Sequence, residues 1–263
     1  DISRRIMTIL ATYSSQIEVY SIDEAFIFID SKIHNNELIT LGHEIRDTIL
    51  SNIGIPVSVG IAATKTLSKV AVKIAKKSKG VECLLNNNIN NILKKISVGD
   101  IWGIGTNRQR YLNLLGISNA LELKLYSKKY ILQKHGTKVL LQIQDELNGI
   151  ISFNIEPIRY TKQKEISYSR TFQYKINDHH QLLKILSSFV SQLSQKLRRI
   201  KKSCLKIEVF ISTDYNSYLS EKNKISHYTN DTRKLETEAR KLLDKLLIHN
   251  GSVKKLGVKL MEL

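Results

Sequence analysis

The 263-residue sequence has little of several residue types that would assign it to a definite class of protein. Its only two cysteines, Cys83 and Cys204, are far apart and lie in no partner motif, so we expect a reducing, cytoplasmic compartment and no disulfide framework. It has no recognisable signal peptide and no apolar run long enough to cross a bilayer, so no membrane partner is expected. Its length exceeds the usual size of a single core, which predicts two or three modules.

Acidic residues are also scarce, with 24 Asp and Glu against 41 Lys and Arg, a net charge of +17 at pH 7. Such an excess suits a polyanion such as nucleic acid, although a basic surface that serves only solubility is the alternative. The excess is uneven, because residues 161–263 hold 21 basic and 10 acidic residues. This C-terminal part is therefore the better candidate for a surface that tracks phosphates.

Hydrophobic periodicity and turn residues divide the chain into an α+β part, a helical part and a second α+β part. Since the chain begins with Asp1 and is helical from its first residues, we expect a fragment whose N-terminal part is missing. In the first part the order is β-β-α-β-α. The expected elements are a helix over 1–15, two strands around a tight turn over 17–30, a helix over 36–54 closed by Gly54, a strand over 55–63 and a helix over 64–77 capped by Thr64.

The remaining elements follow the same periodicity argument. Short helical segments fill residues 86–150, and 153–163 has one of the two prolines and no helical period, which indicates a linker. The second α+β part is expected to contain a strand over 165–174, a helix over 179–200, a strand over 204–214, a helix over 231–248 and a strand over 253–263.

The stretch VYSIDEAFIFID, residues 19–30, places Asp23 next to Glu24 in an apolar, strand-like frame. Side chains on a regular strand alternate between faces, so the two carboxylates can converge only at a hairpin bend. Close carboxylates repel each other unless a cation intervenes, and Mg²⁺ or Mn²⁺ prefers such oxygen ligands. Two-metal phosphoryl transfer uses a cluster of this kind, whereas an exposed turn that happens to contain Asp-Glu is the alternative.

Lysines recur every four residues in the 64–77 helix, at Lys65, Lys69, Lys73 and Lys77. Like charges four residues apart destabilise a helix by about 0.2–0.5 kcal/mol per pair, so this stripe is unfavourable unless it faces acids or phosphates. Lys65 and Lys69 lie near the helix N-terminus, where free N–H groups attract anions, and are the candidate triphosphate contacts. A triphosphate between Lys69 and metals on the acidic pair would satisfy both sides, and a solvated face is the alternative that we favour for Lys73 and Lys77.

The sequence IWGIG, residues 101–105, precedes a basic amphipathic segment and predicts a helix-hairpin-helix. Gly103 and Gly105 allow a tight turn and a close approach of a phosphate to the backbone, and Arg108 lies in the segment that follows. Such a hairpin grips the DNA backbone without reading bases. An ordinary turn between helices is the alternative, and we expect Trp102 to be a core residue rather than a stacking platform.

These elements in this order resemble the Y-family (translesion) DNA polymerases, and most closely the UmuC branch. The resemblance runs over essentially the whole chain and is carried by YSIDEAF (20–26), VGIAATKTLSKVAVKIAKK (59–77), DIWGIGTNRQRYLNLLGI (100–117) and TKQKEISYSRTF (161–172). It implies an α+β fold in parts. These are a partial palm with a mixed sheet and helices (1–85), a small helical thumb with a helix-hairpin-helix (86–152), a linker (153–163) and an α+β little finger that contacts DNA (164–263).

The resemblance also implies roles for individual residues. Asp23 and Glu24 match the second and third catalytic carboxylates, Lys69 matches a lysine that contacts the incoming triphosphate, and Arg170 matches a phosphate contact. The first metal-binding Asp, the fingers and the C-terminal clamp-binding peptide have no counterpart here, and Ser68 replaces a more usual Ala. A two-metal Mg²⁺ site would thus lack one ligand, so the fragment alone is expected to be a poor catalyst or none.

Three hypotheses of function remain at this point. The first is error-prone translesion synthesis in the SOS response to DNA damage, with primer-template DNA and dNTP as partners. In the UmuC branch a UmuD-type dimer and a recombinase filament are expected as further partners, and a sliding clamp is another candidate. The second is a catalytically incomplete, DNA-binding remnant of such a polymerase. The third is an unrelated helix-hairpin-helix repair factor, which would leave YSIDEAF unexplained.

Overall fold

The structure is a computed structural model, and its chain folds as two compact units, residues 1–159 and 160–263. The division falls inside the expected linker over 153–163, of which 157–163 lie outside the described residues. The ranges that the structure describes are 2–30, 35–78, 80–85, 88–133, 137–156, 164–214, 217–248 and 252–263.

The first part of unit 1 contains the helices and strands that the sequence predicts, together with one further strand. Its elements are α1 (Ile2–Tyr13), β1 (Ile17–Val19), β2 (Ala25–Ile27), α2 (Asn35–Ile53), β3 (Val59–Ala62), α3 (Lys65–Ala75) and β4 (Val81–Leu84). Two predicted helix ends are confirmed. Gly54 follows α2 with a φ of +80°, and the hydroxyl of Thr64 caps α3 by accepting the N–H of Leu67.

The described strands of this part form two separate pairs rather than the single mixed sheet that we expected. β1 and β2 are an antiparallel hairpin with Ile17 opposite Ile27, while β3 and β4 are parallel and are joined by α3 as a βαβ crossover. β4 was missed because its four residues carry no alternation that distinguishes them from a loop. β3 is shorter than predicted and begins beyond Pro56, which has no N–H to donate to a ladder.

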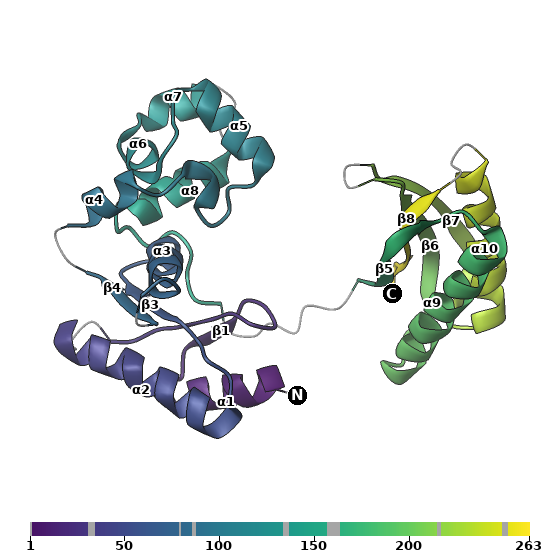
Figure 1. Ribbon diagram of the computed structural model, residues 1–263, viewed down its shortest axis with the longest axis horizontal. Coiled ribbons are helices and arrows are strands. Elements are labelled where there is room, and N and C mark those ends of the chain that lie inside the picture. Colours follow the sequence, from purple (N-terminus) through teal and green to yellow (C-terminus); the bar gives the residue numbers. More distant parts are fainter. Residues whose placement is uncertain are drawn as a thin grey trace. The chain divides into compact units, whose positions relative to one another are not determined.

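The β3–β4 pair lies between α2 and α3, which cover its opposite faces (Figure 1). A Cβ placed on Gly42 of α2 would meet Val59, Ile61 and Val81. A Cβ placed on Gly60 would instead lie 2.4 Å from the backbone of α3. Gly60 therefore allows α3 to approach β3 backbone to backbone, which fixes the height of α3 above the strands.

The rest of unit 1 is helical, as predicted, and shares a core with α3. Its elements are α4 (Ile89–Lys94), a 3-10 turn η1 (Val98–Asp100), α5 (Thr106–Leu114), α6 (Ala120–Leu125), α7 (Lys128–Gln133) and α8 (Lys138–Leu147). Leu67 and Val70 of α3 pack in one cluster with Leu112 and Ile143 of these helices. Because of this common core, the stretches expected as palm and thumb form one compact unit.

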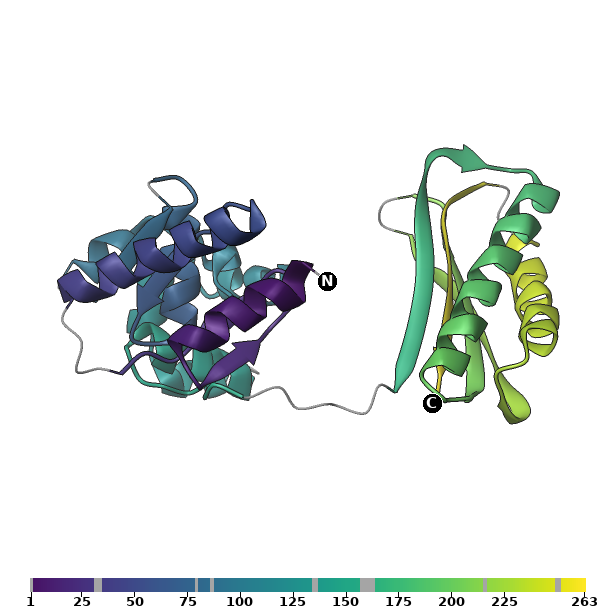
Figure 2. The same cartoon turned by 90° about the horizontal axis from the view of Figure 1, so that it is seen from below.

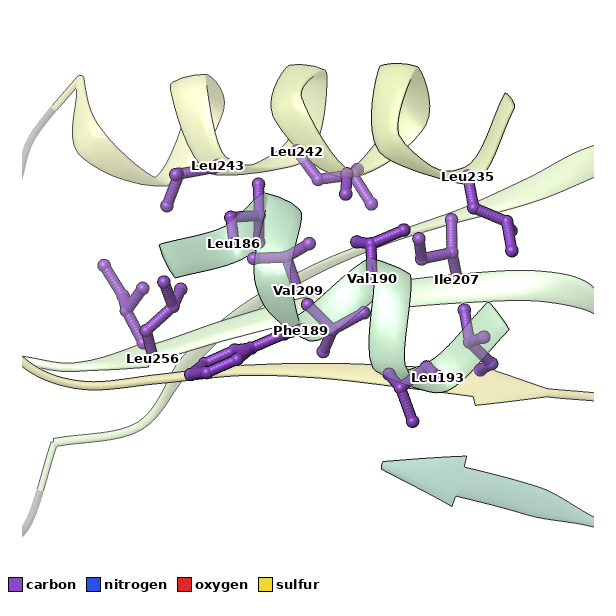
Figure 3. Close-up of a cluster of buried hydrophobic side chains, with 14 of the residues drawn as sticks. Leu186, Phe189, Val190, Leu193, Ile207, Val209, Leu235, Leu242, Leu243 and Leu256 are labelled. Carbon is purple, nitrogen blue, oxygen red and sulfur yellow. The ribbon is translucent and has the colours of Figure 1, made fainter. Parts of the chain in front are cut away.

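Unit 2 is an antiparallel sheet with two helices on one face (Figure 2). In chain order it contains β5 (Glu165–Ile176), α9 (His179–Arg199), β6 (Cys204–Ser212), β7 (Leu219–Thr229), α10 (Thr232–Leu247) and β8 (Val253–Met261), and the strand order is β5-β8-β6-β7. In Figure 3 the apolar side chains of α9 and α10 meet those of β6 and β8, which forms the core of this unit. The sequence analysis missed β7, since Ile225 is its only buried apolar residue and no alternation marks it.

The close approach at Gly60 predicts a large effect of a single methyl group. We expect Gly60→Ala to destabilise unit 1 by about 1–3 kcal/mol, because the backbone of α3 cannot yield as a flexible side chain would. Urea unfolding followed by the emission of Trp102, the only tryptophan, measures this unit. Gly105→Ala is the control, because a Cβ there meets nothing within 4 Å and φ is −90°. Equal shifts of the two midpoints would contradict the proposed steric cause.

Candidate active site

The adjacent carboxylates lie at the hairpin between β1 and β2, as the sequence predicts. The N–H groups of Tyr20 and Ser21 both donate to the carbonyl of Glu24 at 3.0 Å, which closes the turn. This turn removes Asp23 and Glu24 from the strict alternation of a strand, so both carboxylates are available near one end of the hairpin.

Asp23 is exposed, and its Oδ1 accepts a 2.5 Å hydrogen bond from the Ser21 hydroxyl. This hydrogen bond, reinforced by the positive charges of Lys69 and Lys76, holds the pKa of Asp23 below its ordinary value. The carboxylate is therefore ionised at neutral pH and retains lone pairs for a further ligand.

Glu24 forms an ion pair with Lys69 of α3, between its Oε1 and the lysine Nζ. The side chains are 36% and 21% exposed, so the pair remains open to an incoming ligand. Two further lysines of the same stripe also face acids. Lys65 pairs with Glu18 of β1, and Lys73 pairs with Asp100 of η1 at 2.5 Å. Lys73, for which we favoured a solvated face, is 36% exposed and is paired with Asp100 on that face.

Lys65 differs from Lys69 in its environment. Its side chain is only 8% exposed, and its Nζ donates to the Glu18 carboxylate and, at 2.6 Å, to the carbonyl of Asn154. The ammonium also lies 5.2 Å from the centre of the Phe26 ring. These contacts favour a structural role for Lys65 over the triphosphate contact that the sequence analysis expected.

The N-terminus of α3 is already satisfied by groups of the chain itself. The N–H of Thr66 donates to the carboxylate of Glu146 at 2.9 Å, and that of Leu67 donates to Thr64 Oγ1. The anion expected at this helix terminus is thus a buried glutamate of α8. Sequence reasoning missed Glu146, because its partner on α3 lies 80 residues away and no local pattern marks it.

Trp102 joins the carboxylate hairpin to the helical part of unit 1. Its ring lies 5.4 Å from that of Tyr20, 5.7 Å from that of Phe26 and 5.3 Å from that of Phe153, measured between ring centroids. Offset and edge-to-face aromatic contacts of this kind stabilise a packed junction. The residue is half-buried in this aromatic cluster and is not part of the fully buried core, where we had expected it.

The glycine hairpin forms a tight turn between η1 and α5. Gly103 has a φ of +86°, a conformation that favours glycine, and Gly105 is the N-cap of α5. Arg108 donates from Nη1 to the carbonyl of Gly103 at 2.8 Å, so its guanidinium braces the turn. Arg170 lies in unit 2, exposed on strand β5 and opposite Leu256 of β8.

Asp23 and Glu24 are neighbours in this turn, but the described residues hold no group of three or more His, Cys, Asp or Glu that could bind a metal. Asp23 and Glu24 nevertheless supply the hard oxygen donors that Mg²⁺ requires. In the part of the chain that the structure describes, no helix is long and apolar enough to span a membrane.

Comparisons with known proteins show the family to which this fold belongs. Residues 1–73 match the model of the impB/mucB/samB family, and residues 163–263 match the model of its C-terminal domain. UmuC of Salmonella typhimurium is 34% identical over 99% of this chain. DNA polymerase IV of Clostridium acetobutylicum is 29% identical over 98% of it. The solved Y-family DNA polymerase chimera Dbh-Dpo4-Dbh aligns with all of this chain and 75% of its own, with a TM-score of 0.77 and 25% identity.

The chain belongs to the impB/mucB/samB family of Y-family DNA polymerases, on the UmuC branch. It spans 64% of the length of both curated relatives. The hypothesis of an unrelated helix-hairpin-helix repair factor is wrong, because the family matches cover both ends of the chain.

The hydrogen bond from Ser21 predicts a measurable change in acidity. We expect Ser21→Ala to raise the pKa of Asp23 toward its ordinary value, because the first cause of the lowered value is removed. A carboxyl NMR titration measures this. The pKa of Asp231, lowered by N–H groups at the start of α10, is the internal control and should not move. An unchanged Asp23 pKa would show that the hydroxyl does not hold this carboxylate.

Proposed function

We propose that this chain is part of a polymerase that performs template-directed nucleotidyl transfer in translesion DNA synthesis. The observation that carries the proposal is the meeting of the Asp23–Glu24 turn with Lys69 of α3. A carboxylate pair and an accessible ammonium at one place are what a reaction on a nucleoside triphosphate requires. Family membership supports the same reaction, and the UmuC branch favours the SOS response to damage as its setting.

In this proposal Asp23 and Glu24 hold Mg²⁺ together with a further Asp that lies upstream of Asp1. The bound ions would activate the primer hydroxyl and stabilise the pyrophosphate leaving group. The lowered pKa of Asp23 keeps its ligand oxygens ionised at neutral pH. Glu24 becomes available when its ion pair with Lys69 opens.

Lys69 exchanges partners when nucleotide binds. Its ammonium leaves Glu24 and donates to triphosphate oxygens, so the positive charge is neutralised in both states. Lys65 is left out of this contact, because its buried ammonium holds Glu18 and Asn154. Lys69 thus binds the substrate, whereas Lys65, one turn earlier, fixes the position of α3, the helix that carries Lys69.

The DNA contacts follow from the glycine hairpin and from unit 2. Gly103 and Gly105 present backbone near a phosphate, and Arg108 keeps the turn in shape. In unit 2 the alternation of β6 and β8 turns Lys206, Lys255 and Lys259 away from the core that α9 and α10 cover. This basic face suits a DNA backbone. Arg170 lies opposite Leu256 and therefore points to the other side of the sheet, at the exposed edge strand β5, where we propose a separate phosphate contact.

These assignments give the parts of the chain their polymerase roles. Residues 1–85 act as a partial palm, 86–152 as a thumb, 153–163 as a linker and 164–263 as a little finger. Primer-template DNA and dNTP are the proposed partners, and a UmuD-type dimer, a recombinase filament and a sliding clamp are proposed accessory partners. A DNA-binding remnant without catalysis is the second candidate, which is favoured by the two-carboxylate site in the described residues.

Primer extension tests the catalytic proposal with the upstream segment joined to this chain. We expect the double variant Asp23→Ala/Glu24→Ala to lower nucleotide incorporation by about a hundredfold or more, because the groups that bind and stabilise the transferred phosphate are lost. Asp47→Ala, which removes an exposed acid of α2, is the control and should leave the rate unchanged. Incorporation by the double variant at the parent rate would refute the site, and no incorporation by the parent would leave the remnant as the function.

Salt dependence tests the DNA-binding surface. The affinity for duplex DNA should fall steeply as salt rises, and Arg170→Ala should reduce the slope of log affinity against log salt by about one. Arg240→Ala is the matched control, since it removes the same charge from a residue of the same unit that is paired with Glu236. Fluorescence anisotropy of labelled DNA measures both slopes. A flat salt response, or equal changes for the two variants, would argue against Arg170 as a phosphate contact.

A further inference from the structure

Glu146, on the last turn of α8, is a fully buried carboxylate whose partners come from two other segments. Its side chain is 0% exposed. Oε2 accepts the N–H of Thr66 in the first turn of α3 at 2.9 Å, while Oε1 accepts the N–H groups of Ser152 and Phe153 at 2.8 and 3.0 Å. Its carbonyl also accepts the hydroxyl of Thr64 at 2.8 Å. One residue thus joins α8, the start of α3 and the segment after α8.

A charged side chain is energetically unfavourable at a fully buried position such as that of Glu146. Burying a carboxylate is unfavourable unless hydrogen bonds replace its water, and here three N–H donors and the positive end of α3 do so. The neighbouring Ile143 and Leu147 of α8 are buried apolar residues, so packing alone would be served by a leucine. What a carboxylate adds is direction, because its two oxygens fix two backbone segments at defined distances from each other.

Both sides of the Glu24–Lys69 pair are connected to these segments. Thr66 lies three residues before Lys69 on α3, so fixing the first turn of the helix fixes the origin of that lysine. On the other side, the ring of Phe153 packs on Trp102, and Trp102 packs on Tyr20 beside the carboxylate turn.

A second connection reaches the hairpin through Asn154. Its carbonyl accepts Lys65, which in turn pairs with Glu18 of β1. The Glu18 carboxylate also accepts the N–H of Glu156 at 2.6 Å. The segment that Glu146 holds is therefore tied to both strands of the hairpin, through Trp102 to β2 and through Glu18 to β1.

We infer that Glu146 is a positioning residue that sets Lys69 of α3 at the correct place relative to the Asp23–Glu24 turn, so that the ammonium meets the triphosphate of the incoming nucleotide. Glu146 touches neither substrate nor metal in this assignment. The inference rests on the proposed function and adds to it a residue on α8 that controls nucleotide affinity from inside the protein.

Steady-state incorporation by Glu146→Gln tests the role, in the chain with its upstream segment. Glutamine keeps the shape but turns an NH₂ group toward N–H donors, so one of the two backbone segments loses its acceptor. We expect the KM for dNTP to rise about tenfold, the size of effect typical of groups that orient a binding residue, and the KM for primer-template DNA to stay the same. A merely structural role would reduce the active fraction, which lowers kcat and leaves both KM values unchanged.

Gln144→Leu is the matched control on the same helix. Gln144 is also buried, and its amide donates to the carbonyls of Leu123 and Tyr126, which belong to the helical part and not to α3. This variant should unfold at lower urea concentration but keep the KM for dNTP. Glu146→Asp is a second test variant, which keeps the charge but cannot reach both segments, and its KM should lie between those of the parent and Glu146→Gln.

The emission of Trp102 gives a readout that needs neither DNA nor nucleotide. Because Phe153 packs on Trp102, releasing the 152–153 N–H groups should increase acrylamide quenching in Glu146→Gln but not in Gln144→Leu. A parent that incorporates no nucleotide would overturn the proposed function, whereas unchanged quenching would overturn the connection from Glu146 to the hairpin. An active Glu146→Gln variant with the parental KM for dNTP would overturn the positioning role, whatever the quenching.

Discussion

The lysine stripe of α3 is the interaction on which the candidate site depends. Four like charges on one helical face are unfavourable by themselves, and three of them become favourable only because acids from three separate segments face them. Glu18 comes from the first strand of the hairpin, Glu24 from its turn and Asp100 from the 3-10 turn before the glycine hairpin. These ion pairs therefore hold the carboxylate turn, proposed for metal binding, and the turn before the glycine hairpin, proposed for DNA binding, against the helix that carries Lys69, proposed for the triphosphate.

The ion pairs differ in burial, and this difference distinguishes the pair with a structural role from the pair that can open to bind a ligand. The Lys65–Glu18 pair is mostly buried and both charges have further partners in the chain, so the loss of either residue would leave an unpaired, mostly buried charge. The Lys69–Glu24 pair is more exposed, so water and ligands can compete for both partners. Because exposure increases along the helix, the same side chain has a structural role at Lys65 and a proposed ligand-binding role at Lys69.

Much of this could be predicted from the sequence, and the failures have physical causes. The bend at Asp23 and Glu24, the cap at Thr64 and the turn at Gly103 are local, so spacing and residue type were enough. β4 and β7 were missed because short or polar strands carry no alternation. The mixed sheet came from the family resemblance and was wrong for the described strands, because the sequence of a single segment does not determine which strands it pairs with. The role of Glu146 and the pairing of Lys73 depend on contacts between distant segments, which periodicity does not reveal.

The surroundings of α3 have a consequence for how this chain can vary. No residue from Lys65 to Ala75 is fully exposed, since one side approaches β3 at Gly60, another enters the helical core and the third carries the ion pairs. Most amphipathic helices have a solvent-exposed face on which substitutions change stability little. α3 has no such side, so among related chains this helix should change most slowly, and adaptive substitutions should be found elsewhere in the molecule.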